Sequence, residues 1–176
     1  MGKRLFYWEL VGFIFVSALG TLLHFVYDWS GGSVWAAVIS AVNESTWEHM
    51  KLLFFPTFLY TMIQFCVQGH RYPNLLAVRA VSTLAGLGVI PVLYYTYTGV
   101  LGRQINWLNI GIFFVAALVL FWLDFRLLEQ GGLPRRWQQV AGLLILLALA
   151  MLFVYFTFAP PTVALWRDPV TGSYGI

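Results

Sequence analysis

The sequence predicts an all-α integral membrane protein, with about five transmembrane helices plus one short re-entrant or interfacial half-helix. Only 10% of its 176 residues are charged and 60% are apolar, whereas a soluble domain carries about 25% charged residues. Five apolar segments are long enough to cross about 30 Å of hydrocarbon at about 1.5 Å per residue. They are residues 5–27, 46–67, 74–98, 106–126 and 137–158. The apolar stretch 33–42 is too short to span, which favours the half-helix.

The first apolar segment follows Lys3 and Arg4, as a signal peptide would. It is longer than a signal-peptide core and contains Glu9 and His24. We therefore expect a retained transmembrane helix and no cleaved signal.

The second spanning helix is expected to begin inside a polar run, Asn43 to Lys51. Ser45-Thr46-Trp47-Glu48 has the spacing of a capping box, and Asn43 offers a second cap. The positive end of the helix dipole would then point at whatever lies over Glu44. Pro56 is expected to kink this helix.

We expect one compact domain, with residues 1–158 forming the transmembrane bundle and residues 159–176 an extracytoplasmic tail. Pro160-Pro161 ends the fifth helix. One hypothesis is that the tail folds back as a lid, with Arg167 or Asp168 touching the polar run. The alternative is an interfacial tail anchored by Trp166 and Tyr174.

The Lys and Arg residues predict the orientation. With a cytoplasmic N-terminus, seven fall on the cytoplasmic side and three on the other, as the positive-inside rule requires. The seven are Lys3, Arg4, Arg71, Arg79, Arg126, Arg135 and Arg136, and the three are Lys51, Arg103 and Arg167. We expect a multi-pass protein of the bacterial plasma (inner) membrane, with a cytoplasmic N-terminus and an extracytoplasmic C-terminus.

Composition also narrows the function classes. The single cysteine, Cys66, excludes an intramolecular disulfide and a cysteine-based zinc finger. The net charge of +3 arises mainly from loop Lys and Arg residues, and no pattern typical of nucleic-acid binding is present. The expected partners are the lipid bilayer and a lipid-linked or small-molecule ligand. The sequence does not fix an oligomeric state.

Small and polar residues form stripes on three of the predicted helices, and such stripes mark packing faces in membranes. The topology gathers two polar groups, one at each end of the bundle. The inner group is Glu9, Arg79, Asp124 and Arg126, for which we expect ion pairs. The outer group is His24, Asp28, Asn43, Glu44, Glu48, His49, Lys51, Tyr97, Arg103 and Asn106.

The outer group offers ligands for a divalent metal such as zinc. The candidate ligands are His24, Asp28, His49 and Glu44, and the candidate catalytic residues are Glu48, Glu44 and Lys51. Glu48 or Glu44 would act as general base, and a desolvated lysine can act as a base or bind an anionic headgroup.

Two other interpretations of the outer group remain open. In a structural interpretation, Glu48 closes the capping box and pairs with Lys51, and His24 bonds Asp28. Glu44 then forms a salt bridge with an arginine, Arg103 or Arg167. In the other interpretation, the group is a metal-free catalytic or proton-relay site.

Three blocks of the sequence carry a resemblance. They are His24-Phe25-Val26-Tyr27-Asp28-Trp29-Ser30, the run Asn43 to Lys51, and Asp168-Pro169-Val170-Thr171-Gly172-Ser173-Tyr174-Gly175. The chain resembles a family of uncharacterised bacterial multi-pass membrane proteins with Asn-Glu-Ser-x-Trp-Glu-His and Asp-Pro-x-Thr-Gly-x-Tyr-Gly blocks. The resemblance implies an integral bacterial membrane protein, and it brings no activity with it.

The functional hypothesis is a membrane-embedded hydrolase or transferase that acts on a lipid-linked substrate at a metal site in the outer third of the bundle. One alternative is a small transporter or ion-binding module, in which the helix start near residues 43–46 faces an anion. A second alternative is a non-catalytic membrane partner subunit.

Overall fold

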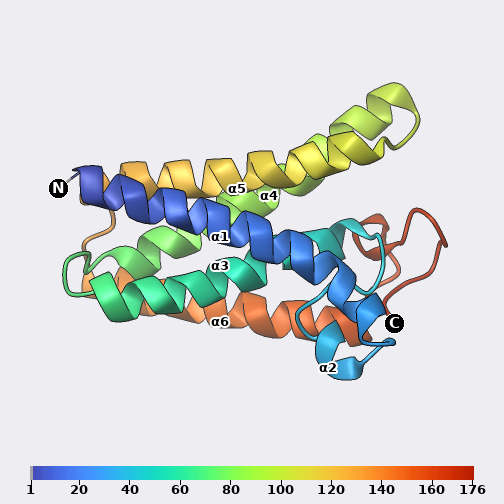
Figure 1. Cartoon of the computed structure of the whole chain (residues 1–176), viewed down its shortest axis with the longest axis horizontal. Helices are drawn as coiled ribbons and strands as arrows, with labels where there is room; N and C mark the ends of the chain where they lie inside the picture. Colours follow the sequence, from blue (N-terminus) through green and yellow to red (C-terminus); the bar gives the residue numbers. More distant parts are fainter. Residues whose placement is uncertain (1) are drawn as a thin grey trace.

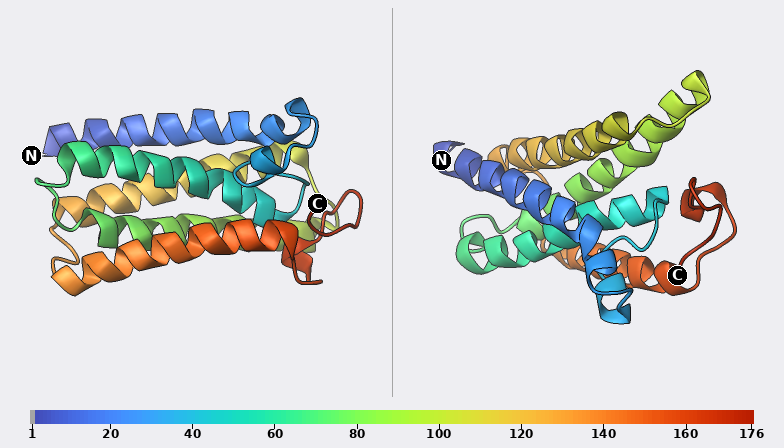
Figure 2. Two further views of the ribbon diagram at one scale, coloured as in Figure 1. Left: turned by 90° about the horizontal axis from the view of Figure 1, so that it is seen from below. Right: turned by 45° about the vertical axis from the view of Figure 1, so that its right-hand side comes forward.

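The computed structural model describes residues 2–176 and is all-helical, as the sequence predicts. Five long helices run side by side along the long axis of the molecule (Figures 1 and 2). They are α1 (Gly2–Trp29), α3 (Thr46–Gln68), α4 (Leu75–Leu101), α5 (Asn106–Glu129) and α6 (Arg136–Phe158). Each is long and apolar enough to cross a membrane, and they differ from the predicted segments by a few residues at their ends. The prediction of a multi-pass helical protein is confirmed at this level.

The short apolar stretch between α1 and α3 forms a helix of four residues, α2 (Val34–Ala37). It lies at the end of the bundle where the chain terminates, beside the end of α1 (Figure 1). The tail that follows α6 also lies at this end, with one turn of 3-10 helix, η1 (Ala164–Trp166). We call this end, which holds α2, the loop 38–45 and the tail, the C-terminal end of the bundle.

Small residues allow the helices to approach closely. A Cβ atom at Gly20 of α1 would lie 2.7 Å from the carbonyl oxygen of Leu52 in α3. One at Gly142 of α6 would lie 2.6 Å from the carbonyl oxygen of Leu76 in α4. Backbone contact of this kind is the usual way in which membrane helices pack. Gly20 therefore fixes how close α1 and α3 lie, one turn before His24.

Aromatic side chains pack together in the C-terminal half of the core. Trp47 of α3 packs against Phe153 of α6, with ring centroids 4.5 Å apart, and against Trp166 of η1 at 4.9 Å. This aromatic stack fixes the start of α3 and the tail on α6. The outward surface stays apolar, with Trp122, Leu144 and Met151 each more than half exposed, as bilayer contact requires.

Candidate metal centre

Three potential metal ligands from separate segments meet at the C-terminal end of the bundle. His24 comes from the last turns of α1, Glu44 from the loop before α3, and His49 from the first turn of α3. One ligand atom from each residue lies within 4.8 Å of the other two. The two imidazole rings are 5.4 Å apart, centroid to centroid.

The distances between these atoms resemble those between ligands of one ion. Nε2 of His24 is 3.6 Å from Oε1 of Glu44, and Nε2 of His49 is 3.5 Å from Oε2. Good hydrogen bonds are shorter than this. Two ligands of a tetrahedral zinc, each about 2.0–2.1 Å from the ion, are about 3.3 Å apart. The carboxylate thus lies between the two histidines. Its oxygens would need to move only slightly closer to the two Nε2 atoms for all three residues to bind one ion.

The start of α3 orients His49. Nδ1 of His49 is 3.0 Å from the carbonyl oxygen of Ser45. A carbonyl only accepts hydrogen bonds, so Nδ1 carries a proton and Nε2 is the nitrogen that faces Glu44. This carbonyl–histidine contact is the usual outer-shell support of a metal-binding histidine. His24 has no such support, because its buried Nδ1 has no hydrogen-bond partner.

A small pocket adjoins the centre. Its volume is about 30 Å³, which is enough for about one or two ordered water molecules. The side chains of the centre are partly accessible, with 30% of His24, 26% of His49 and 49% of Glu44 exposed. The pocket is lined by Glu44, Thr46, His49, Ile90, Tyr94, Asn109, Ile112 and Phe113.

Asp28, the fourth predicted ligand, does not join this group. It lies one turn beyond His24 on α1 and is exposed. Neither a hydrogen bond nor an ion pair joins Asp28 to His24 in residues 2–176, and Nδ1 of His24 stays unpartnered. Glu44 contacts the two histidines and forms no ion pair with Arg103 or Arg167 in this part of the chain.

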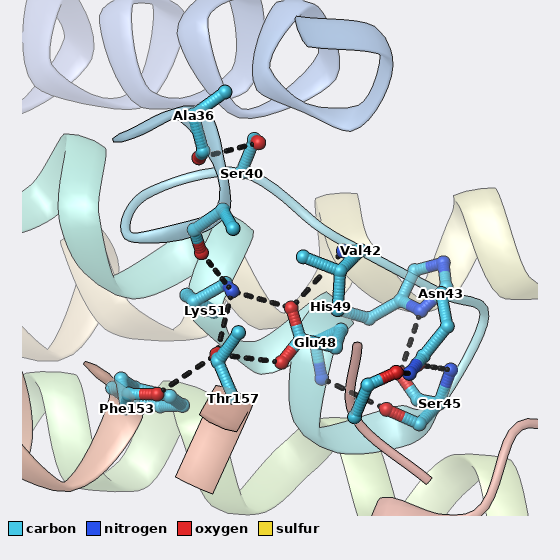
Figure 3. A network of polar contacts seen from close by, with 12 residues as sticks. Ala36, Ser40, Val42, Asn43, Ser45, Glu48, His49, Lys51, Phe153 and Thr157 are labelled. Atoms are coloured by element: carbon cyan, nitrogen blue, oxygen red, sulfur yellow. Dashed lines mark hydrogen bonds and ion pairs between the residues drawn. The ribbon is translucent and has the colours of Figure 1, made fainter. Parts of the chain in front are cut away.

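Glu48 and Lys51 form a separate, fully buried network (Figure 3). Lys51 forms an ion pair with Glu48 and donates hydrogen bonds to the carbonyl oxygen of Ala37 and to Oγ1 of Thr157, both at 2.8 Å. Glu48 also accepts from the backbone N–H of Val42 at 3.2 Å and interacts with Thr157 at 2.9 Å. All three ammonium donors are used. The network joins α2, the loop before α3, and α6.

The capping box predicted at the start of α3 is only half formed. Oγ of Ser45 accepts from the backbone N–H of Glu48 at 3.3 Å, as expected. The return bond is absent, because the N–H of Ser45 donates to Oδ1 of Asn43 at 2.9 Å. Glu48 is therefore free to turn inward to Lys51, as the structural interpretation of this pair expected.

The tail folds back onto the bundle, but through other residues than the lid hypothesis named. The carbonyl oxygen of Gly175 accepts a hydrogen bond from Nδ2 of Asn43 at 3.0 Å. Asp168 is buried in its own turn, where it accepts from the N–H of Val170 at 2.8 Å and from Oγ1 of Thr171 at 2.6 Å. Arg167 and Asp168 instead line a second, more open pocket, which shares Thr46 and Tyr94 with the first.

The inner polar group is built as predicted for three of its four members. Arg79 pairs with Asp124, with Nη2 2.7 Å from Oδ2, and with Glu9, with Nη2 3.4 Å from Oε2. Arg126 is exposed and takes no part. The ion pairs are buried among α1, α3, α4 and α5.

Two polar residues in these networks were not singled out by the sequence. Thr157 belongs to an apolar helix and lies 106 residues from Lys51, and Gln64 bridges Glu9 and Arg79. The signal available for Gln64 was an amide inside a spanning segment, where a polar group needs a partner. Thr157 gave no comparable signal, because threonine can satisfy itself on its own helix.

Comparison with known proteins gives a family match. No curated protein and no solved structure matches the chain. The family described as "Family of unknown function (DUF6512)" matches residues 3–176. The match spans nearly the whole chain, including the centre and both buried networks. The protein therefore belongs to this family of unknown function, DUF6512.

Proposed function

We propose that His24, Glu44 and His49 bind a divalent metal ion such as zinc, and that the protein is a membrane-embedded hydrolase or transferase acting on a lipid-linked substrate. The observation that carries the proposal is the convergence of the three ligand atoms within 4.8 Å from three separate segments. Two histidines and one glutamate are the ligand set of several catalytic zinc sites, in which the fourth position stays open. A bound ion of this kind supplies an activated water and a Lewis acid.

The roles of the protein residues follow from their surroundings. His49 is oriented by the carbonyl of Ser45, so its ring is held for ligation. Glu44 is half exposed and is the carboxylate that borders the pocket, so it combines the ligand role with that of proton acceptor. Glu48 and Lys51 are buried in their own network and support the start of α3, so their proposed role is structural and not chemical.

The substrate side of the proposal uses the second pocket. It shares Thr46 and Tyr94 with the first pocket, and Arg167 is its one basic lining residue. A guanidinium suits a phosphate group. A lipid-linked phosphate bound there would reach the metal from the side of the tail. The excess of Lys and Arg at the other end of the bundle supports placing this site at the outer leaflet of a bacterial inner membrane.

Metal analysis of the purified protein tests the binding step. We expect one zinc ion per chain in the wild type, and a loss of affinity of at least ~10-fold in His49→Ala. His70→Ala is the matched control, since His70 is exposed and lies outside the centre. Absence of stoichiometric metal, or equal loss in both variants, would refute the metal centre.

The chemical step is tested with vesicles of a bacterial total lipid extract. The zinc-loaded wild type should convert at least one lipid species detectable by mass spectrometry, and His49→Ala should convert none. If zinc binds but the lipids stay unchanged, the enzyme proposal is wrong and an ion-binding module takes its place.

A further inference from the structure

Three members of the inner polar group, Glu9, Arg79 and Asp124, lie in contact, and their formal charges do not balance. Four side chains from four helices meet there: Glu9 of α1, Gln64 of α3, Arg79 of α4 and Asp124 of α5. Glu9 is 3% exposed and the other three are 0% exposed. All four side chains are thus buried in the interior of the bundle.

All the acceptors crowd around one nitrogen of the guanidinium. Nη2 of Arg79 is 2.7 Å from Asp124, 3.4 Å from Glu9, and 2.5 Å from Oε1 of Gln64. The amide of Gln64 donates to Oε1 of Glu9 at 2.8 Å, so it links the carboxyl of Glu9 to the guanidinium. Nε and Nη1 of Arg79 and both carboxyl oxygens of Asp124 are buried without a hydrogen bond, so the 2.7 Å contact of Oδ2 with Nη2 is an ion-pair distance only. A guanidinium paired twice with ionised carboxylates would use its fork of donors, so this arrangement is not that of two full ion pairs.

The surroundings add no second cation. Within residues 2–176, Arg79 is the one Lys or Arg whose side-chain nitrogen lies within 4.0 Å of a carboxyl oxygen of Glu9 or Asp124. The rings of Tyr60 and Phe121 lie against the guanidinium, 5.7 Å and 5.1 Å from their centroids. The hydroxyl of Tyr60 is turned to the carbonyl oxygen of Trp8. Of the other charged groups on α1, Arg4 lies five residues from Glu9 and is exposed.

One guanidinium and two ionised carboxylates leave a net charge of −1 in the interior of the bundle. An unbalanced charge inside a membrane protein is costly. Two carboxyl groups that share a site avoid this cost by binding one proton between them. We propose that the Glu9–Arg79–Asp124 group is a proton-binding site that holds one proton, shared by Glu9 and Asp124. The proton comes from water and binds reversibly, and the proposal does not depend on the metal centre.

Infrared spectroscopy of the full-length protein tests the proposal directly. A protonated carboxylic acid has a carbonyl stretching band that carboxylates lack. We expect this band in the wild type at neutral pH and expect it to disappear at alkaline pH. A wild type without the band at neutral pH overturns the proposal, and so does a band that appears only after sodium is removed, which would mean a bound cation.

Isosteric variants test the sharing. Glu9→Gln and Asp124→Asn each leave one carboxylate to balance one guanidinium, so the band should vanish in both. Arg79→Gln removes the cation, so the band should double. The control is Glu129→Gln, because Glu129 is exposed near the end of α5, and it should leave the band unchanged. A band that survives either single substitution refutes the shared proton, and the wild-type titration decides the matter if a variant does not fold.

Discussion

Replacing Lys51 by methionine tests whether the Glu48–Lys51 network is structural. The side chain of Lys51 is fully buried and that of Glu48 is 2% exposed, so Lys51→Met leaves a buried carboxylate without its cation. Breaking a buried ion pair in this way costs about 3–5 kcal/mol. The backbone carbonyl of Ala37 also loses its donor. We expect the free energy of unfolding to fall by about that amount.

The double variant Glu48→Gln/Lys51→Met separates charge from packing. It removes both charges, and the new amide can still bond Thr157, so the loss should shrink to about 1–2 kcal/mol. Measured against the single variants Lys51→Met and Glu48→Gln, the two substitutions should therefore have a coupling energy of about 2 kcal/mol or more.

The measurement is unfolding in detergent micelles by circular dichroism along a titration with sodium dodecyl sulfate. Lys3→Met is the control, because Lys3 is exposed at the start of α1, and it should change stability by less than about 0.5 kcal/mol. The reasoning fails if Lys51→Met costs less than about 1 kcal/mol or if the two single losses simply add. The amount of zinc bound per chain of the purified Lys51→Met protein should equal that of the wild type.

Four further predictions concern the neighbouring features. Gly20→Val should destabilise the bundle by about 1–3 kcal/mol and weaken metal binding, because its side chain meets the backbone of Leu52; unfolding and metal analysis measure both. Trp166→Ala should speed protease cleavage of the tail while metal binding persists, and an unchanged cleavage rate would contradict the aromatic anchor. Metal affinity should fall at acidic pH, since both imidazoles must be neutral to bind, and a flat pH profile in zinc titrations would argue against histidine ligands. In a cysteine-free background, Arg103→Cys should react with an impermeant maleimide from outside intact cells and Arg71→Cys should not. The reverse pattern would mean that the predicted orientation is wrong.

The five long helices were predictable because their signal is local. Length and hydropathy set each span, and the structure moves the ends by only a few residues. The meeting of His24, Glu44 and His49 followed from topology, since helices of alternating direction bring those segments to one end. The sequence could not predict which turn of α1 faces the site, because that depends on the close contact between Gly20 and the backbone of Leu52 in α3. Asp28 was predicted as a ligand one turn too far along.

The assignment of Glu48 shows how one hydrogen bond changes a motif. Spacing alone predicted that its side chain would return to the N–H of Ser45. Asn43 occupies that N–H instead, so Glu48 turns to Lys51 and to Thr157, a partner from the last spanning helix. The four-residue capping-box pattern carries no information about Thr157, because that residue lies on a distant helix.

The length of α4 sets how a ligand can arrive. Its 27 residues extend about 40 Å, against about 30 Å of hydrocarbon, and its hairpin with α5 projects beyond the other helices (Figure 1). Tyr94 and Ile90, which line the pocket, lie about 10 and 16 Å before the end of the helix. Because the helix is longer than the hydrocarbon is thick, we expect its end to project past the hydrocarbon and the pocket to lie near the headgroup layer, below the tip of the hairpin. The lipid-linked ligand proposed for this pocket would arrive by diffusion in the plane of the membrane, so its occupancy should follow the mole fraction of that lipid in the leaflet and not its bulk concentration.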